Sequence, residues 1–266
     1  MGSKGRSRRS RSSGTSAPNS GRVTTYRDQA VVLRKLDYGE ADRIYTLLTR
    51  EHGKVGAIAK GVRKTSSKLA HALGLYAHID VLLAHGRSLD VVAQAQLMPG
   101  ARLQAEVERT AHAALIAEVA ERVTEDRHPV DGIYELTVFA LEELAREIEP
   151  RRASAYFLSN ALELLGYAPQ LSSCASCAKT LEPFETAFSP GAGGFLCGDC
   201  AEPGMILVSV AALKVLRLIA AGDIALYRRL KLEPAVLSEV EAVLEAQLEH
   251  HLDRRLKSLQ FLRSMR

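Results

Sequence analysis

Residues 77–97 read AHIDVLLAHGRSLDVVAQAQL, two stretches rich in aliphatic side chains on either side of His85-Gly86-Arg87. The aliphatic pattern predicts strands over residues 77–84 and 88–97. A short connection that contains glycine can turn one strand directly back on the next. We therefore predict a β-hairpin in this part of the chain.

Three further strand patterns precede the hairpin, at residues 29–36, 43–49 and 54–59. The first is centred on a pair of valines, and a His-Gly turn separates the second from the third. Five short strands with turn signals between them are typical of a small Greek-key barrel. A polar, basic loop that opens with glycine, residues 61–68, joins the third predicted strand to the hairpin.

After Pro99-Gly100, the apolar residues recur with the spacing of an α-helix. An Ala-rich stripe predicts a first helix that permits close packing, and it comprises Val107, Ala111, Ala114, Leu115 and Val119. Further helices are predicted over residues 132–148, 151–165, 209–221 and 234–251. We therefore predict an α+β fold with a disordered arm over residues 1–22, a barrel domain over 23–100, and a helical domain over 101–266 into which a glycine-rich module, 171–204, is inserted.

The 266-residue chain carries a net charge of +4 that is unevenly distributed. Residues 1–22 hold six basic and no acidic side chains, residues 23–100 carry a net +4, and residues 101–266 carry −6. The first 20 residues contain no Val, Ile, Leu, Phe or Tyr and cannot repay the entropy of ordering. We expect an anionic partner to meet the N-terminal part of the chain, with the arm adding non-specific phosphate affinity or no function at all.

The four cysteines form two Cys-x-x-Cys pairs, Cys174 with Cys177 and Cys197 with Cys200, separated by nineteen residues. Each pair places two thiolates on one side of a tight turn, so two pairs complete a tetrahedron around Zn²⁺. Four thiolates leave no coordination position for water, and we predict one structural zinc ion. The alternatives are free buried cysteines or redox pairs, but a redox pair needs a thioredoxin-like sheet that the sequence does not indicate.

The sequence contains no complete motif for catalysis. Residues 56–61, GAIAKG, have the glycine spacing of a phosphate-binding loop, but Val62-Arg63 stand where Lys and Ser/Thr must hold phosphate and Mg²⁺. No stretch approaches the roughly 18 apolar residues of a membrane helix, and the N-terminus lacks the apolar segment of a secretory signal. We therefore expect a cytoplasmic, nucleoid-associated binding protein that is not an enzyme.

Basic residues of the barrel are the candidates for DNA contact, because Lys and Arg along a barrel face neutralise phosphates without reading sequence. Aromatic residues for base stacking are limited to Tyr26, Tyr38, Tyr45 and Tyr76. The predicted DNA-binding residues are Arg34, Lys35, Lys54, Lys60, Arg63, Lys64 and Lys68.

Three segments carry a resemblance to a known family: Tyr38-Gly-Glu-Ala-Asp-Arg43; Gly53-Lys-Val-Gly-Ala-Ile-Ala-Lys-Gly-Val-Arg63; and Leu164-Leu-Gly-Tyr-Ala-Pro169, which leads into the cysteine module with Phe188-Ser-Pro-Gly-Ala-Gly-Gly194. In this order, over residues 25–266, the chain resembles the bacterial RecO recombination and repair proteins. The resemblance implies an N-terminal OB-fold, a helical domain that carries a zinc module, and no catalytic site. The basic arm lies outside this family pattern.

The resemblance also implies binding of single- and double-stranded DNA, annealing of complementary strands, and partnership with RecR and single-stranded DNA-binding protein in loading RecA. Recognition of the acidic, apolar tail of single-stranded DNA-binding protein calls for an apolar groove with a basic rim. Arg151-Arg152, at the start of a predicted helix, are candidates for that rim.

Two other functions remain open at this point. One is a metal-dependent nuclease, in which Asp37, Glu40 and Asp42 would collect the metal, although these acids are more simply interpreted as a polar turn between two strands. The other is a zinc-stabilised scaffold that binds only proteins. Cleavage of labelled DNA would indicate the nuclease, and absence of DNA binding would indicate the scaffold.

Overall fold

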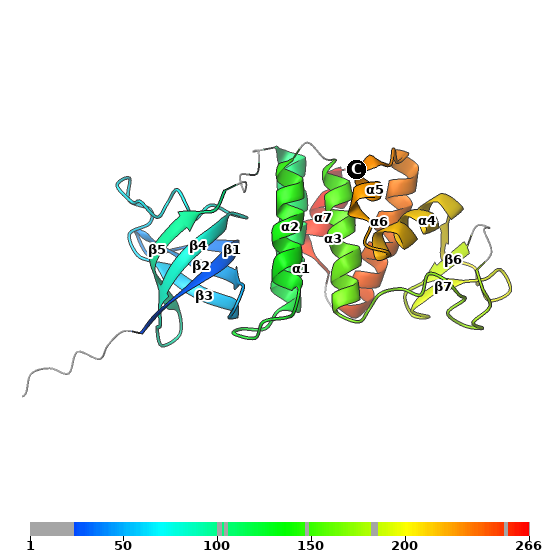
Figure 1. The fold of residues 1–266 in the computed structure, drawn as a ribbon, viewed down its shortest axis with the longest axis horizontal. Coiled ribbons are helices and arrows are strands. Elements are labelled where there is room, and N and C mark those ends of the chain that lie inside the picture. The colour runs from blue at the N-terminus through cyan, green and yellow to red at the C-terminus, as the bar shows by residue number, and fades with distance from the viewer. Residues whose placement is uncertain are drawn as a thin grey trace, which may run out of the picture.

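The computed structural model describes residues 24–99, 103, 106–146, 149–181, 186–252 and 255–265. A five-stranded barrel lies at one end of the molecule, helices fill the middle, and the cysteine module lies at the other end (Figure 1). The predicted arm over residues 1–22 lies outside the described residues. Within the described ranges, no helix is both long and apolar enough to cross a membrane.

The barrel confirms the five predicted strands: β1 (Thr25–Tyr38), β2 (Asp42–Thr49), β3 (Gly53–Ala59), β4 (His78–Ala84) and β5 (Asp90–Leu97). Their spatial order is β1-β2-β3-β5-β4, and the barrel is closed. Neighbouring strands are antiparallel except β3 and β5, which pair in parallel over a short length. The loop of the predicted hairpin runs to Leu89, because the buried Asp90 carboxylate accepts a hydrogen bond from the backbone N–H of Gly86 at 3.1 Å.

Alternation of side chains along β3 shows how the barrel is filled. Val55, Ala57 and Ala59 are buried in the interior, whereas the residues between them are partly exposed. Val62 and Leu73, from the segment between β3 and β4, close one end of this interior. The segment is therefore anchored by apolar residues while its polar residues face solvent.

A second face of the barrel packs against the helices. Val31, Leu33 and Leu48 belong to the same buried cluster as the helical core. Lys54 reaches the C-terminal end of the first helix, where Nζ donates to the carbonyl oxygens of Glu121 at 3.1 Å and Thr124 at 2.7 Å. The outer face of the barrel thus joins the helical core, while the barrel interior remains a separate cluster.

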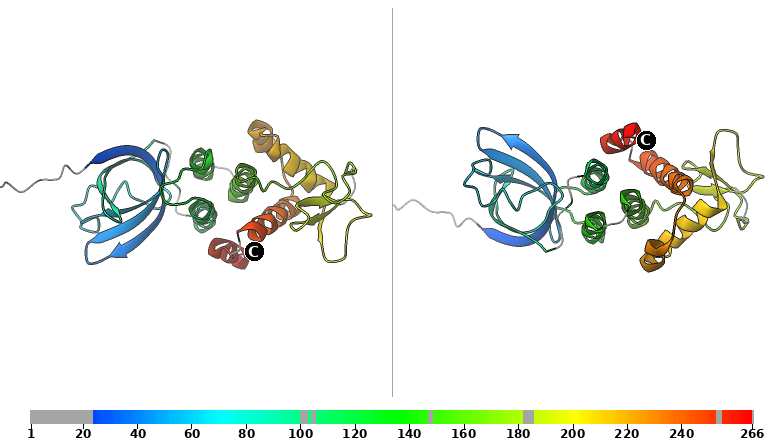
Figure 2. Two further views of the ribbon diagram at one scale, coloured as in Figure 1. Left: turned by 90° about the horizontal axis from the view of Figure 1, so that it is seen from below. Right: turned by 90° about the horizontal axis from the view of Figure 1, so that it is seen from above.

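Seven helices are described: α1 (Val107–Val123), α2 (Ile133–Ala145), α3 (Pro150–Leu164), α4 (Val210–Ala220), α5 (Ile224–Arg229), α6 (Pro234–His251) and α7 (Lys257–Met265). Five of them correspond to predicted helices. Neither α5 nor α7 is predicted by the sequence analysis, because a helix of six or nine residues presents too few turns for an apolar period. In Figure 2, α7 lies against α1 at one side of the helical bundle.

The cysteine module contains a small sheet that the sequence analysis did not predict. Its strands β6 (Thr186–Ser189) and β7 (Gly194–Leu196) pair with β8 (Ile206–Val208), which follows the module directly, in the order β7-β6-β8. Phe188 and Phe195 face each other across β6 and β7, with ring centroids 5.2 Å apart, and both are buried in the helical core. These aromatic rings attach the module to the helices.

Candidate nucleic-acid interface and metal centre

The four cysteines meet at one point of the module. All four Sγ atoms lie within 4.8 Å of one another, and those of Cys177 and Cys197 are 3.7 Å apart. Turns form at both pairs, since Ala178 N–H donates to the carbonyl oxygen of Cys174 and Cys200 N–H to that of Cys197. The quartet predicted from spacing is therefore assembled in three dimensions.

Electrostatics at the quartet fit a cationic occupant. Burial raises the pKa of the Cys174 thiol, but hydrogen bonds from the backbone N–H groups of Cys177 and Cys197 lower it to about 6. Hydrogen bonds to Cys177 and Cys197 raise the pKa of Cys200 to about 12. One thiolate is thus favoured and a neighbouring one is opposed, and a divalent cation between the sulfur atoms would offset the repulsion among four thiolates. The chemistry of the donor set suits Zn²⁺ held by Cys174, Cys177, Cys197 and Cys200.

The turn between β1 and β2 organises the basic loop 60–68. The Asp37 carboxylate accepts a 2.6 Å hydrogen bond from Arg43 Nε and lies 3.5 Å from Arg63 Nε. Arg63 also bonds to this turn through its backbone N–H, which donates to the carbonyl oxygen of Ala41 at 2.9 Å. Asp42 accepts from the backbone N–H of Gly61 at 2.7 Å. The two family segments around Tyr38 and Gly53 therefore meet here in space.

The acidic residues of this turn are engaged with cations and backbone groups. Because Arg43 donates a hydrogen bond to it, the Asp37 carboxyl has a lowered pKa. Among the described residues, the cysteine quartet is the only group of His, Cys, Asp or Glu side chains placed to hold a metal. This arrangement supports the interpretation of Asp37, Glu40 and Asp42 as a polar turn.

Six of the seven predicted DNA-binding residues lie at this end of β1 or in the loop, and they are exposed. Arg34 has 62% of its side chain exposed and lies 3.8 Å from Glu121. Within the described ranges, no ion pair involves the four lysines of the set, Lys35, Lys60, Lys64 and Lys68. These six residues, which we call the basic face, are Arg34, Lys35, Lys60, Arg63, Lys64 and Lys68.

Lys54 differs from the other six. Only 19% of its side chain is exposed, and its ammonium group bonds to two carbonyl oxygens at the end of α1. A cation is stabilised at the C-terminus of a helix by the helix dipole. Spacing along the sequence placed Lys54 with the basic face, but the structure places it in the joint between barrel and helices.

Of the four barrel tyrosines, Tyr38 offers the most exposed ring. It is 55% exposed at the end of β1, as is Leu36. Tyr45 is buried in the barrel interior, and Tyr26 donates a 2.5 Å hydrogen bond to Asp90. Tyr76 lies beside the helical core with a positive φ of 62°. The basic face thus has one aromatic platform of its own.

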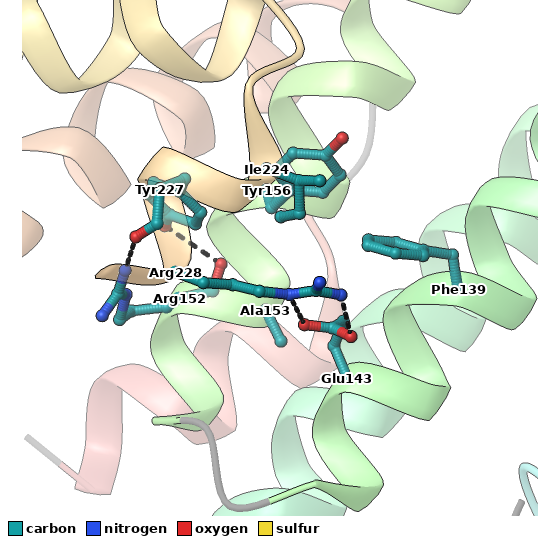
Figure 3. Close-up of a pocket in the computed structure, with 8 residues that line it drawn as sticks. All are labelled: Phe139, Glu143, Arg152, Ala153, Tyr156, Ile224, Tyr227 and Arg228. Atoms are coloured by element: carbon teal, nitrogen blue, oxygen red, sulfur yellow. Dashed lines mark hydrogen bonds and ion pairs between the residues drawn. The ribbon is translucent and has the colours of Figure 1, made fainter. Parts of the chain in front are cut away.

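A small apolar pocket in the helical domain is formed by α2, α3 and α5 (Figure 3). Phe139, Tyr156 and Tyr227 supply aromatic walls. Arg228 forms two hydrogen bonds to the Glu143 carboxylate, at 2.6 and 2.8 Å, and lies over the Phe139 ring. The pocket is therefore apolar inside and basic at its edge.

Arg151 and Arg152 take different places around this pocket. Arg152 lines the pocket, lies over the Tyr227 ring, and donates to the carbonyl oxygens of Tyr227 and Leu230. Arg151 points instead to α6, where it pairs with Glu241 at 2.6 Å. The sequence analysis missed Phe139, Tyr156 and Arg228, since no local pattern joins residues from three separate helices.

The chain thus combines a closed five-stranded barrel of the OB type with helices and a four-cysteine centre that is compatible with a metal ion. Models of the families "Recombination protein O N terminal" and "Recombination protein O C terminal" match residues 23–100 and 104–260. The chain belongs to the RecO family of DNA repair proteins, which are recombination mediators.

Two curated relatives are similar over nearly their whole length. DNA repair protein RecO of Dehalococcoides mccartyi is 35% identical over 242 residues, 90% of this chain and 96% of the relative. DNA repair protein RecO of a Nocardioides species is 38% identical over 245 residues, 89% of this chain and 98% of the relative. The resemblance inferred from the sequence segments is therefore confirmed.

Proposed function

We propose that this protein binds single- and double-stranded DNA without sequence specificity and anneals complementary strands. The observation that carries the proposal is the basic face, in which Asp37 and Asp42 hold the loop and leave its lysines exposed. Exposed cations lower the repulsion between two phosphate backbones. Salt-sensitive contacts then let strands exchange registers until base pairs form. This activity needs no covalent chemistry, so the proposal includes no enzymatic step.

The proposal is tested by annealing of labelled complementary oligonucleotides across a salt series. The Arg63→Ala, Lys64→Ala, Lys68→Ala variant should anneal poorly at near-physiological salt, where screening removes long-range attraction. A protein lacking residues 1–22 should still anneal, with a shallower salt dependence. Wild-type binding and annealing by the triple variant would reject the assignment, and cleaved product would favour the nuclease.

The proposal extends to recombination partners. It places the protein with RecR, and with single-stranded DNA-binding protein, in the loading of RecA. The pocket of Figure 3 supports docking of an acidic, apolar tail, because Arg152 and Arg228 line it together with aromatic rings. A carboxylate could meet the cations, and the aromatic walls would take an apolar side chain.

Anisotropy of a labelled tail peptide tests this part of the proposal. We expect Arg228→Ala to weaken binding, whereas Arg229→Ala, its exposed neighbour outside the pocket lining, removes the same charge and should not. Equal loss in both variants would indicate general charge attraction instead of a site. In this proposal the zinc ion is structural: it holds the cysteine module together and takes no part in annealing.

A further inference from the structure

A groove separates the barrel from one side of the helical domain, and the proposed function does not yet use it. It lies between β1, α1 and α7, and its volume of about 720 Å³ is within the range of small-molecule sites. Leu33, Ala114 and Ala117 contribute apolar surface to its wall. Charged and aromatic side chains from both domains surround this apolar surface.

Cations outnumber anions in the groove. Arg34 comes from the barrel, while Arg122 and Lys257 come from the helical domain. Of the two acids, Glu118 lies 3.6 Å from Arg122, and its carboxylate also accepts hydrogen bonds from the backbone N–H and the hydroxyl of Ser258 at 2.8 and 2.7 Å. Glu121 remains as the acid beside Arg34, at 3.8 Å. The groove thus favours an anionic occupant.

Two aromatic rings from different domains line the same groove. Phe261 is 51% exposed on α7, although the neighbouring residues Leu259 and Leu262 are buried against the rest of the protein. Tyr76 lines the groove from the barrel side with a φ of 62°, a conformation that is strained for a bulky residue. Strained residues of this kind cluster at functional sites.

We propose that a single strand of DNA lies in this groove, with bases on Phe261 and Tyr76 and phosphates at Arg122 and Lys257. The inference rests on the proposed function and extends its DNA path onto the helical domain. A basic groove with aromatic platforms is the usual arrangement for single strands, and only unstacked bases can reach the rings. Continuity favours DNA over a protein segment, because Arg34 belongs both to this groove and to the basic face.

The test uses full-length protein and labelled oligo(dT) in a salt series. The Arg122→Ala, Lys257→Ala double variant should lower the slope of log affinity against log salt by about 1.4, since each single-strand contact contributes roughly 0.7. The matched control is the Lys214→Ala, Arg229→Ala double variant, which removes two exposed charges outside the groove. It should lower the slope less than the groove variant does. Glu121→Gln should tighten binding, because it removes the acid beside Arg34.

Phe261→Ala should weaken oligo(dT) binding about tenfold, since it removes the ring on which one base would stack. Met265→Ala on the same helix, 43% exposed and outside the groove lining, is the matched control. Binding of duplex DNA to Phe261→Ala should stay near wild type. Unchanged melting and zinc content would show that each variant is folded.

The outcomes separate this inference from the proposed function. Wild-type oligo(dT) binding by both groove variants, together with loss in the Arg63, Lys64, Lys68 triple variant, would overturn the groove and leave the basic face standing. Wild-type behaviour of the triple variant would overturn the proposed function itself. Groove variants that lose an acidic, apolar peptide but keep DNA would assign the groove to a protein and overturn the inference.

Discussion

The basic loop 60–68 and the cysteine module 171–204 are both poor in regular structure, yet they are held in different ways. The loop is fixed by Val62 in the barrel interior, by an ion pair between Arg63 and Asp37, and by a hydrogen bond from the backbone N–H of Gly61 to Asp42. The module is closed around four cysteines whose sulfur atoms lie within 4.8 Å of one another. Apart from Arg63, which also pairs with Asp37, the cations of the loop take no part in holding it and remain exposed, whereas the module is held by its own cysteine side chains.

This difference shows where each segment can be functional. In the loop, the groups that fix the backbone are mostly separate from the lysines that can meet a ligand, and Arg63 is the residue that belongs to both sets. In the module, the thiolates that would bind metal are the same groups that fix the fold, which leaves no open coordination position. The comparison therefore predicts that cysteine changes act on stability and that loop changes act on DNA binding.

The largest effect is expected for Cys174→Ser or Cys197→Ser. Either change should release the metal and destabilise the helical domain, because metal-binding free energy is also folding free energy in a loop-rich module. Metal analysis and thermal unfolding measure this. Lys179→Ala, which removes an exposed ion pair to Asp199 and one positive charge near Cys177 and Cys197, should keep the metal and change stability little. Wild-type protein purified without chelators with far less than about one zinc per chain would refute the prediction.

Lys54 in β3 and Lys60 in the turn after it test the same distinction between stability and DNA binding within the barrel. Lys54→Ala removes two hydrogen bonds from a mostly buried ammonium group and should cost about 1–3 kcal/mol of unfolding free energy, with the salt slope of DNA binding unchanged. Lys60→Ala should lower that slope by about 0.7–0.9 and leave stability within about 0.5 kcal/mol. Denaturant unfolding and salt titration of both variants distinguish the roles, and reversed results would contradict the placement of both residues.

A smaller effect is expected at Asp37. The hydrogen bond from Arg43 lowers the pKa of the Asp37 carboxyl in the folded protein. The charged carboxylate therefore helps to hold the loop at any pH above the ordinary Asp pKa. This contribution is lost as the pH falls through the lowered pKa. Arg43→Ala should raise the pKa toward its ordinary value. Carboxyl NMR titration measures both proteins, and an identical pKa in the two would show that Arg43 is not the cause.

The smallest expected effect concerns nucleotide. Residues 56–61 have phosphate-loop glycine spacing, but the structure places them in β3 and the turn after it, and Val62 is buried in the barrel. We expect no ATP hydrolysis and no change in annealing on addition of ATP. ATPase activity that co-purifies with the protein and disappears in Lys60→Ala would contradict this.

The sequence by itself determined the five strands, five of the helices and the cysteine quartet. These features depend on local patterns: alternation within a strand, apolar spacing along a helix, and two Cys-x-x-Cys turns. It also indicated six cations of the barrel that the structure shows to be exposed, because charged side chains between apolar anchors usually face solvent.

Only the tertiary structure decided which neighbours these residues meet. Lys54 and Lys60 look alike in the sequence, but the end of α1 lies beside one and solvent beside the other. Likewise, the pocket at Phe139 and the groove at Phe261 join residues from helices far apart in the chain. A local pattern reports which face of an element is apolar or charged. What covers that face depends on long-range packing, which no single segment encodes.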